Sequence, residues 1–265
     1  MKKILYLLPL LALLACTERI DLELNEGDNQ KLVVDAWITD QPKEQFVRLT
    51  LTTSYYYNQA APPASEASVQ LSDEETTYIL TEREKGYYYL PGDFRTKIGQ
   101  LYTLDISYGG KSYTATSLLR PISPIDSVGY YLDDPEENLY AITLYAQEPA
   151  GEGDNYFFKN YKRGTTTADT LRNAEIANDE VVDGNYIGGA DIGYETYAVG
   201  DTVDVEMYSI QREAFDYFLA ILLETEFRGG PFDTPPANVP TNISGDAKGF
   251  FIMSAVSSDW LVIEE

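Results

Sequence analysis

Apolar and polar residues alternate in short runs along most of the first half of the chain. The clearest runs are Leu32–Ile38, Val47–Leu51, Ala67–Leu71, Leu101–Tyr108 and Lys111–Ser117. A period of two is typical of strands with one buried face, and in the first run that face consists of Leu32, Val34, Ala36 and Ile38. Gly109 and Gly110 separate the last two runs and supply the positive φ angles of a two-residue hairpin turn. With weaker runs at 77–81 and 87–90, the pattern predicts an immunoglobulin-like β-sandwich over residues 31–119.

A proline-rich segment over residues 120–127 interrupts this pattern. Pro121 and Pro124 deny the backbone strand hydrogen bonds and stiffen it, so we place a linker and a domain boundary here. Residues 128–265 are predicted to form a second β-rich domain, with strands near 128–131, 139–146, 156–161, 203–208, 249–257 and 260–264. The stretch 163–200 is rich in Gly, Asp, Asn and Thr and gives only weak strand signals.

One amphipathic helix is predicted over about residues 210–227. Its apolar residues recur on one face at helical spacing, and they are Ile210, Ala214, Tyr217, Phe218, Ile221 and Leu222. Ser209 is placed to cap the first turn, and Gly229 and Gly230 to end the last. Because the polar face lacks the lysines of helices that lie on membranes, we expect the helix to pack on the second sheet.

The chain begins with the features of a secretion signal. Lys2 and Lys3 precede the uncharged run Ile4–Ala15, which leads into Cys16, the only cysteine. The run is shorter than the roughly 20 residues that span a bilayer. The segment resembles the lipobox of bacterial lipoproteins, and this resemblance implies a signal peptide over 1–15, acylation at Cys16 and a lipidated tether over 16–30. The alternative is an ordinary secretory signal with a chance cysteine.

The composition narrows the choice of partners. The chain has a formal net charge of −24 and contains no histidine. A surface this acidic repels nucleic acids and anionic lipid head groups. We therefore expect no nucleic-acid partner, and we expect attachment to the membrane through acyl chains. Without histidine, and with one cysteine, zinc sites built from Cys and His are excluded. No cofactor is indicated.

No enzyme signature stands out, so we expect a non-catalytic protein with no catalytic residues and no metal site. The chain lacks a Gly-x-Ser-x-Gly elbow and a phosphate loop, and any carboxylate pair chosen as a glycosidase site would be arbitrary. The acidic loops 133–138 and 179–184 are weak calcium candidates because neither has the alternating spacing of a calcium loop. Triplets of Asp, Ser or Thr, and an apolar residue, at Ser127, Thr170 and Thr202, resemble O-glycan acceptors of Bacteroidota surface proteins.

Two loops supply the candidates for contact with a partner or ligand. The first carries Tyr55, Tyr56 and Tyr57 in a chain with 22 tyrosines, and tyrosine offers contact area together with a hydroxyl. The second, Pro231–Gly245, contains four prolines, which favour an ordered loop, and loops of this length are often functional. Its contact candidates are Phe232, Asn238 and Asn242.

Several segments, taken together, resemble one known family. They are Cys16–Leu22, Leu32–Asp40, Pro121–Asp126, Tyr208–Ile210, Pro235–Gly245 and Gly249–Phe251. In this combination the chain is similar to the Bacteroidota lipoprotein family domain of unknown function 4249, over nearly all of the chain that follows the signal peptide. Members have no established catalytic residues and commonly lie beside genes for TonB-dependent outer-membrane receptors. The resemblance implies an outer-membrane lipoprotein, on the periplasmic or cell-surface face, that serves a TonB-dependent nutrient uptake complex as an accessory subunit.

Two other functions fit the same features. A stand-alone surface module would bind a glycan or peptide through tyrosine-lined loops such as Tyr55–Ser65. A fimbrial or adhesive subunit would exchange strands between protomers. Both, like the accessory subunit, are binding functions without acid–base chemistry.

Overall fold

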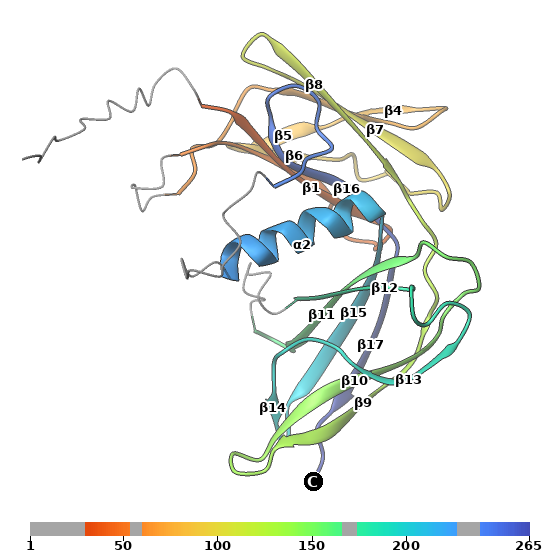
Figure 1. Cartoon of the computed structure of the whole chain (residues 1–265). Helices are drawn as coiled ribbons and strands as arrows, with labels where there is room; N and C mark the ends of the chain where they lie inside the picture. The colour runs from red at the N-terminus through yellow and green to blue at the C-terminus, as the bar shows by residue number, and fades with distance from the viewer. Residues whose placement is uncertain (1–29, 54–59, 166–173, 227–238) are drawn as a thin grey trace, which may run out of the picture. The chain divides into compact units, whose positions relative to one another are not determined.

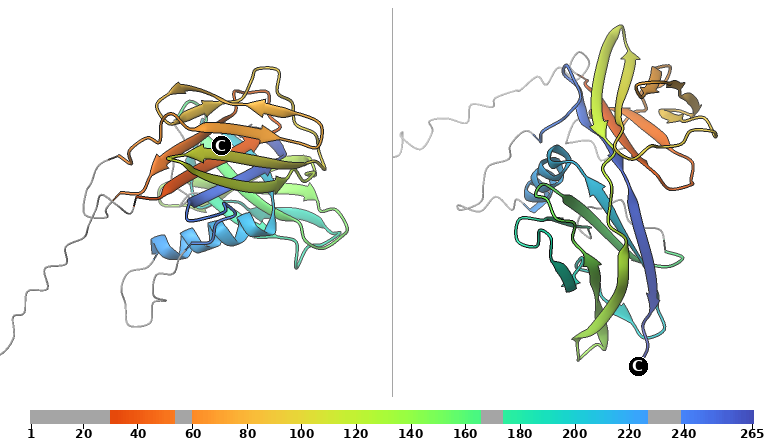
Figure 2. Two further views of the ribbon diagram at one scale, coloured as in Figure 1. Left: turned by 90° about the horizontal axis from the view of Figure 1, so that it is seen from above. Right: turned by 90° about the vertical axis from the view of Figure 1, so that its right-hand side faces the viewer.

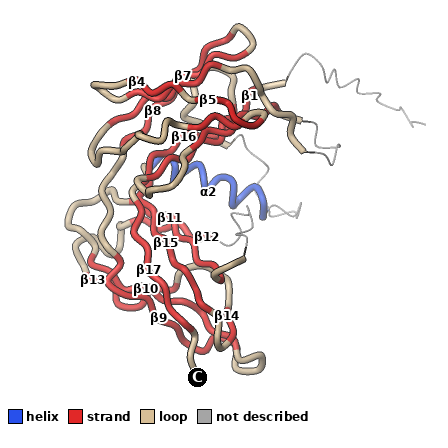
Figure 3. The backbone as a smooth tube through the Cα atoms, turned by 180° about the vertical axis from the view of Figure 1, so that it is seen from behind, coloured by secondary structure: helices blue, strands red, loops and turns tan. Residues whose placement is uncertain are grey.

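The computed structural model of the chain describes residues 30–53, 60–165, 174–226 and 239–265, and Lys31–Glu265 forms one compact unit. Four β-sheets and helix α2 (Arg212–Glu226) make up the described part (Figure 1). Strands dominate and α2 is the helix among them, as Figure 3 shows by colour. The predicted mostly-β fold is confirmed. In the ranges just given, no helix combines the length and the apolar character needed to cross a membrane.

Two sheets form the first sandwich. The β1 sheet has the order β16 (Lys248–Ser254), β1 (Leu32–Thr39), β2 (Phe46–Leu51), β6 (Tyr87–Tyr89) and β5 (Thr81–Glu84). The β7 sheet has the order β4 (Thr77–Ile79), β3 (Ser68–Ser72), β7 (Leu101–Tyr108) and β8 (Lys111–Leu118). Their facing side chains form one core, including Leu49, Leu71, Tyr102 and Phe251. The sequence predicted this packing correctly, because Leu32, Val34, Ala36 and Ile38 are all buried.

Two further sheets form the second sandwich. In the β10 sheet, β10 (Leu139–Gln147) pairs with β9 (Ile125–Asp134), β13 (Tyr186–Asp191) and β14 (Tyr197–Ala198). The β15 sheet has the order β12 (Ala174–Asn178), β11 (Asn155–Lys162), β15 (Thr202–Ile210) and β17 (Val256–Val262). Ile142 and Leu144 from one sheet meet Val203, Val205 and Met207 from the other in a second core.

The last two strands correct the predicted domain boundaries. Residues 248–254, assigned from the sequence to the second domain, form β16 and pair in parallel with β1 of the first sandwich. After Ala255 the chain enters β17 of the second sandwich, so the blue strands at the chain end pass from one sandwich to the other (Figure 2, right). The predicted linker is also too long, since β9 begins at Ile125. Three strands, β12 to β14, lie in the stretch with weak strand signals.

Helix α2 begins two residues later than predicted, and Ser209 does not cap it. Ser209 belongs to β15, where its hydroxyl donates to the Arg120 carbonyl at 2.9 Å and accepts the Ala255 N–H at 3.1 Å. This hydroxyl therefore ties three separate chain segments together. The predicted helix end at Gly229 and Gly230 lies outside the described residues.

The predicted apolar face of α2 is buried at Ala214 and Phe218, whereas its other members Tyr217, Ile221 and Leu222 are half-buried. Ala214, Phe215 and Phe218 pack with Phe157 of β11, Tyr208 of β15 and the outward side chains Phe250 and Ile252 of β16. Trp37 of β1 joins this third core, with ring centroids 4.9 Å from Phe157 and 5.4 Å from Phe218. The helix thus packs on the second sandwich, as expected, and on the first sandwich too.

Candidate functional site

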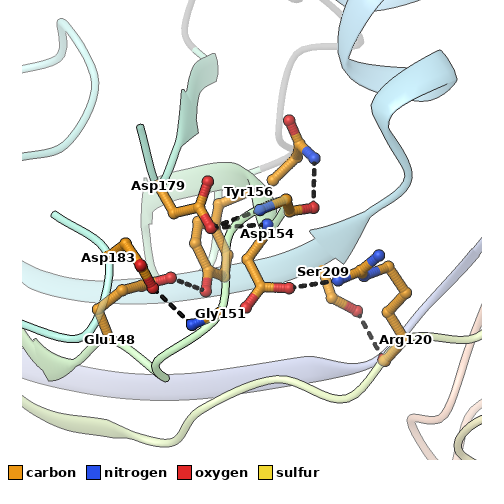
Figure 4. A network of polar contacts seen from close by, with 10 residues as sticks. Arg120, Glu148, Gly151, Asp154, Tyr156, Asp179, Asp183 and Ser209 are labelled. Carbon is orange, nitrogen blue, oxygen red and sulfur yellow. Dashed lines mark hydrogen bonds and ion pairs between the residues drawn. The ribbon is translucent and has the colours of Figure 1, made fainter. Parts of the chain in front are cut away.

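A carboxylate network lies where two glycine-containing acidic turns of the second sandwich meet (Figure 4). Asp179, after β12, accepts the N–H groups of Gly153 at 2.7 Å and Asp154 at 2.9 Å through Oδ2. Asp183 accepts the Gly151 N–H at 2.6 Å. These bonds fasten the β10–β11 connection to the β12–β13 connection.

Two side chains of this network reach other partners. Asp154 pairs with Arg120 at 2.6 Å, at the start of the segment that joins the two sandwiches. Glu148, at the end of β10, accepts the Tyr156 hydroxyl at 2.8 Å. Of the four carboxylates, Asp154 is the one that pairs with Arg120, and Glu148 and Asp179 are only 3% and 2% exposed.

The electrostatics of the network follow from burial. Burial raises the pKa of Glu148, and Asp154, Asp179 and Asp183 add to the rise, while the Tyr156 hydrogen bond opposes it. The same burial, together with Glu148, raises the pKa of Tyr156, so the phenol stays protonated and donates.

The carboxylates lie close enough to bind a cation, but each of the four already has a hydrogen-bond or ion-pair partner within the protein. Oxygen atoms of Glu148, Asp154 and Asp179 all lie within 4.8 Å of one another, close enough to share one cation. Calcium takes six to eight oxygen ligands, and here Arg120, Tyr156 and backbone N–H groups already bind these carboxylates. The arrangement explains how two loops and the inter-sandwich segment are joined, and it assigns no catalytic role.

Sequence reasoning found only half of this network. The turn 179–184 is a weak calcium candidate in the sequence, and the structure buries its first residue, Asp179, against backbone N–H groups. Glu148 and Asp154 were missed, although the segment Glu148–Asp154 is a second acidic turn with two glycines. The other predicted acidic loop, 133–138, is a solvated turn in which Asp134 accepts the N–H groups of Glu136 and Glu137.

A polar pocket of about 610 Å³ lies between the β1–β2 loop and the outer face of the β15 sheet. Glu206 is central to its wall, because it accepts Gln41 Nε2 at 3.1 Å and the Tyr208 hydroxyl at 2.6 Å. Burial and the charge of Glu206 raise the pKa of Tyr161, another wall residue, to about 12. In the described part of the chain, Gln41 Oε1 is buried without a hydrogen-bond partner.

Of the predicted contact residues, only Asn242 lies in the described part. The residues outside it are positions 16–29 of the tether, including Cys16, the tyrosines Tyr55, Tyr56 and Tyr57, and the loop residues Phe232 and Asn238. Asn242 is half-buried, and its amide binds backbone groups of two strands, Phe251 in β16 and Thr116 in β8. The structure thus gives Asn242 a role in the fold. For the predicted O-glycan acceptors, Ser127 is exposed in β9, Thr202 is half-buried at the start of β15, and Thr170 is not described.

Comparison with known proteins identifies the family. A family model described as a domain of unknown function (DUF4249) matches residues 17–259. The chain belongs to this family. That membership confirms the resemblance read from the sequence and covers both sandwiches of this DUF4249 chain. A search of curated proteins gives no match.

Solved structures similar to this DUF4249 chain include a two-domain fibronectin type-III segment from chicken tenascin. It is 15% identical, and the alignment covers 69% of this chain and 92% of that chain with a TM-score of 0.22. A cytokine receptor complex is 11% identical, with coverage of 69% and 85% and a TM-score of 0.23.

Proposed function

We propose that this DUF4249 protein is a lipid-anchored, non-catalytic accessory subunit of a TonB-dependent uptake complex in the outer membrane. The observation that carries the proposal is the N-terminal sequence, in which Lys2, Lys3 and Ile4–Ala15 lead directly into Cys16. An acylated Cys16 would fasten the chain to a membrane surface, since more than one acyl chain gives lasting attachment.

The rest of the chain is compatible with a binding role. Its polar clusters are engaged in holding loops and sandwiches together, as Asp179 and Asp154 do. The chain has no histidine, the side chain that most often serves as a general base. Membership of DUF4249 supports the receptor partnership only through the gene arrangement that the family resemblance implies.

Two experiments test the proposal. Radiolabelled palmitate should enter the intact protein and not the Cys16→Ser variant, which should leave the membrane fraction. The anchored protein, purified from gently solubilised outer membranes, should bring with it a TonB-dependent receptor identified by mass spectrometry. If wild-type protein takes up no labelled palmitate, the proposed lipid anchor is wrong. If the protein purifies without a TonB-dependent receptor, the proposed receptor partnership is wrong.

A further inference from the structure

A second pocket, of about 440 Å³, lies at the end of the first sandwich where the β1–β2 loop turns. Its other walls are Arg83 of β5 and the connection from β6 to β7. The volume falls within the range of about 300–1,000 Å³ that is typical of small-molecule sites. The pocket beside Glu206 shares Asp40–Lys43 as a wall, so the β1–β2 loop borders both. We call the smaller one the β1–β2 pocket.

Buried hydrogen bonds hold the β1–β2 loop in shape. Gln45 Oε1 accepts the Thr39 N–H at 3.0 Å, and Gln45 Nε2 donates to Thr39 Oγ1 at 3.1 Å and to the Gln41 carbonyl at 3.2 Å. The Gln45 carbonyl also accepts the Leu90 N–H at 3.0 Å, which ties the loop to the β6–β7 connection. Thr39 and Gln45 are both buried. The walls are therefore formed before any ligand arrives, and binding need not order them.

The β6–β7 connection gives the β1–β2 pocket an apolar wall. Leu90 and Phe94 are buried, and Phe94 packs edge-on against Tyr78 with ring centroids 4.9 Å apart. Ile98, from the same connection, is 53% exposed. Apolar surface that is fixed in place and still reaches solvent favours a ligand with an apolar body.

The charged side chains of the β1–β2 pocket are three cations, Lys43, Arg83 and Arg95, and two carboxylates, Asp40 and Glu44. This excess of cations occurs in a chain whose net charge is −24. Both carboxylates are already bound within the protein, since Glu44 pairs with Arg83 at 2.5 Å and Asp40 Oδ1 accepts the Val256 N–H at 3.0 Å. Val256 lines the pocket beside Glu206 and not this one, so Asp40 Oδ1 is directed toward that neighbouring pocket.

Lys43 and Arg95 are the two cations of this pocket without a carboxylate. Within the described ranges neither side chain forms an ion pair. Arg95 Nη1 donates to the carbonyls of Gly92 at 3.0 Å and Phe94 at 2.6 Å, which fixes the guanidinium on the β6–β7 connection. In the same ranges Arg95 Nε and Nη2 bind no acceptor. A carboxylate or phosphate can accept two parallel hydrogen bonds from such a guanidinium edge.

We propose that the β1–β2 pocket binds a small organic anion. The apolar body of the ligand lies along the β6–β7 wall, and its carboxylate or phosphate group binds Arg95 and Lys43. A cationic ligand is repelled by these two side chains. A polyanion that extends beyond the pocket meets the acidic surface of the chain, so the ligand is small. The lipid anchor and the receptor partner play no part in this site, and its test is independent of theirs.

Photoaffinity labelling of the full-length protein in a non-ionic detergent tests this site. The probes 4-benzoylbenzoate and 4-benzoylphenyl phosphate each carry a photoreactive apolar body and one anionic group, and 4-benzoylbenzamide is the matched neutral probe. We expect the adducts of at least one anionic probe to map by peptide mass spectrometry to residues 39–45 or 83–98, and the stronger of the two identifies the anionic group. Labelling there by the neutral probe should be about ten-fold weaker, the effect of one lost charge-assisted hydrogen bond. Equal labelling by all three probes, adducts mainly elsewhere, or no adduct would overturn the proposal.

Charge removal supplies the second arm. Lys43→Gln with Arg95→Gln should reduce labelling by the better anionic probe about ten-fold. The control Lys85→Gln with Arg212→Gln removes a lysine and an arginine that are exposed outside the pocket, and it should leave labelling unchanged. Equal loss in both pairs would assign the effect to the net charge of the chain, and loss in neither would remove the two cations from the site, so either result contradicts the proposal. The comparison of probes on the wild-type protein requires no substitution and decides the matter even if a variant unfolds.

Discussion

The side-chain amide of Asn242 binds the backbone of Phe251 in both directions. Its Oδ1 accepts the Phe251 N–H at 2.9 Å, and its Nδ2 donates to the Phe251 carbonyl at 2.8 Å. The same Nδ2 lies 3.2 Å from the Thr116 carbonyl of β8. One amide thus takes the place of a neighbouring strand for β16 and joins the edges of the two sheets of the first sandwich.

Replacing this amide should therefore weaken the fold of the first sandwich. Asn242→Ala leaves backbone groups of Phe251 and Thr116 without partners, and we expect a loss of roughly 2–3 kcal/mol in the free energy of unfolding. Asn242→Asp keeps the acceptor but sets a carboxylate oxygen against the carbonyl oxygens of Phe251 and Thr116, so its loss should be at least as large. Urea titrations followed by far-UV circular dichroism measure both. Equal stability of Asn242→Ala and wild type would show that these bonds contribute nothing net.

A second prediction concerns Gly249 of β16, whose backbone lies tightly against Val34 of β1. Gly249 has a φ of +89°, and a Cβ at this position would overlap the Val34 carbonyl oxygen. Gly249→Ala should therefore cost far more than the ~1–2 kcal/mol of the left-handed conformation alone. Gly110, with a φ of +76° and open space around its Cβ position, is the matched control. Similar melting temperatures for the two alanine variants would contradict this close approach.

The residues of β1 show how far sequence reasoning reaches. Alternation alone identified Leu32, Val34, Ala36 and Ile38 as one buried face, because a strand has a fixed period of two. The other face of the same strand carries Trp37, which joins the third core with α2. Which element would cover that face depends on contacts between distant parts of the chain, and the local pattern does not contain them.

The predictions that were wrong or incomplete also concern contacts between distant parts of the chain. Ser209 has the right residue type to cap a helix, but tertiary contacts with Arg120 and Ala255 use its hydroxyl. Lys248–Ser254 reads as a strand and is one, yet its parallel pairing with β1 bridges more than two hundred residues, and no local signal specifies it. The carboxylates of the network in Figure 4 likewise come together only because two turns meet in space. The local sequence thus specified whether a segment forms a strand or a helix, but it did not specify which other segment that element contacts.

Trp37 supports a third prediction, about the contact between the sandwiches. Its ring lies between Phe157, Tyr208 and Phe218, and its indole N–H donates to Ser254 Oγ at 2.9 Å. Trp37→Ala should lower the free energy of unfolding by about 3 kcal/mol through the lost aromatic volume. Trp37→Phe keeps most of that volume and loses the hydrogen bond, so about 1 kcal/mol is expected.

Chemical denaturation can also show what Trp37 couples. If its ring holds the two sandwiches in one cooperative unit, Trp37→Ala should give a lower m-value or two separate transitions. The control is Ala36→Gly on the opposite face of β1, which weakens the first core without touching α2. A single transition with an unchanged m-value in Trp37→Ala would contradict the coupling.

The last prediction is a pH dependence that originates at Glu148. Burial raises its pKa above the usual value of 4.5, and Asp154, Asp179 and Asp183 act in the same direction, whereas the Tyr156 hydroxyl opposes them and Arg120 neutralises only Asp154. The folded state therefore holds this proton more tightly than the unfolded state does. Its stabilising effect is complete below pH 4.5 and is lost as the pH rises through the raised pKa.

Glu148→Gln isolates this contribution, because the amide oxygen can still accept the Tyr156 hydroxyl and carries no proton to lose. We expect the stability of wild type, relative to that of Glu148→Gln, to fall as the pH is raised from 4.5 to 7. Urea unfolding at several pH values measures the difference. Glu152→Gln, an exposed carboxylate in the same turn, is the control and should follow wild type. Parallel pH profiles for wild type and Glu148→Gln would show that Glu148 titrates alike in the folded and unfolded chain.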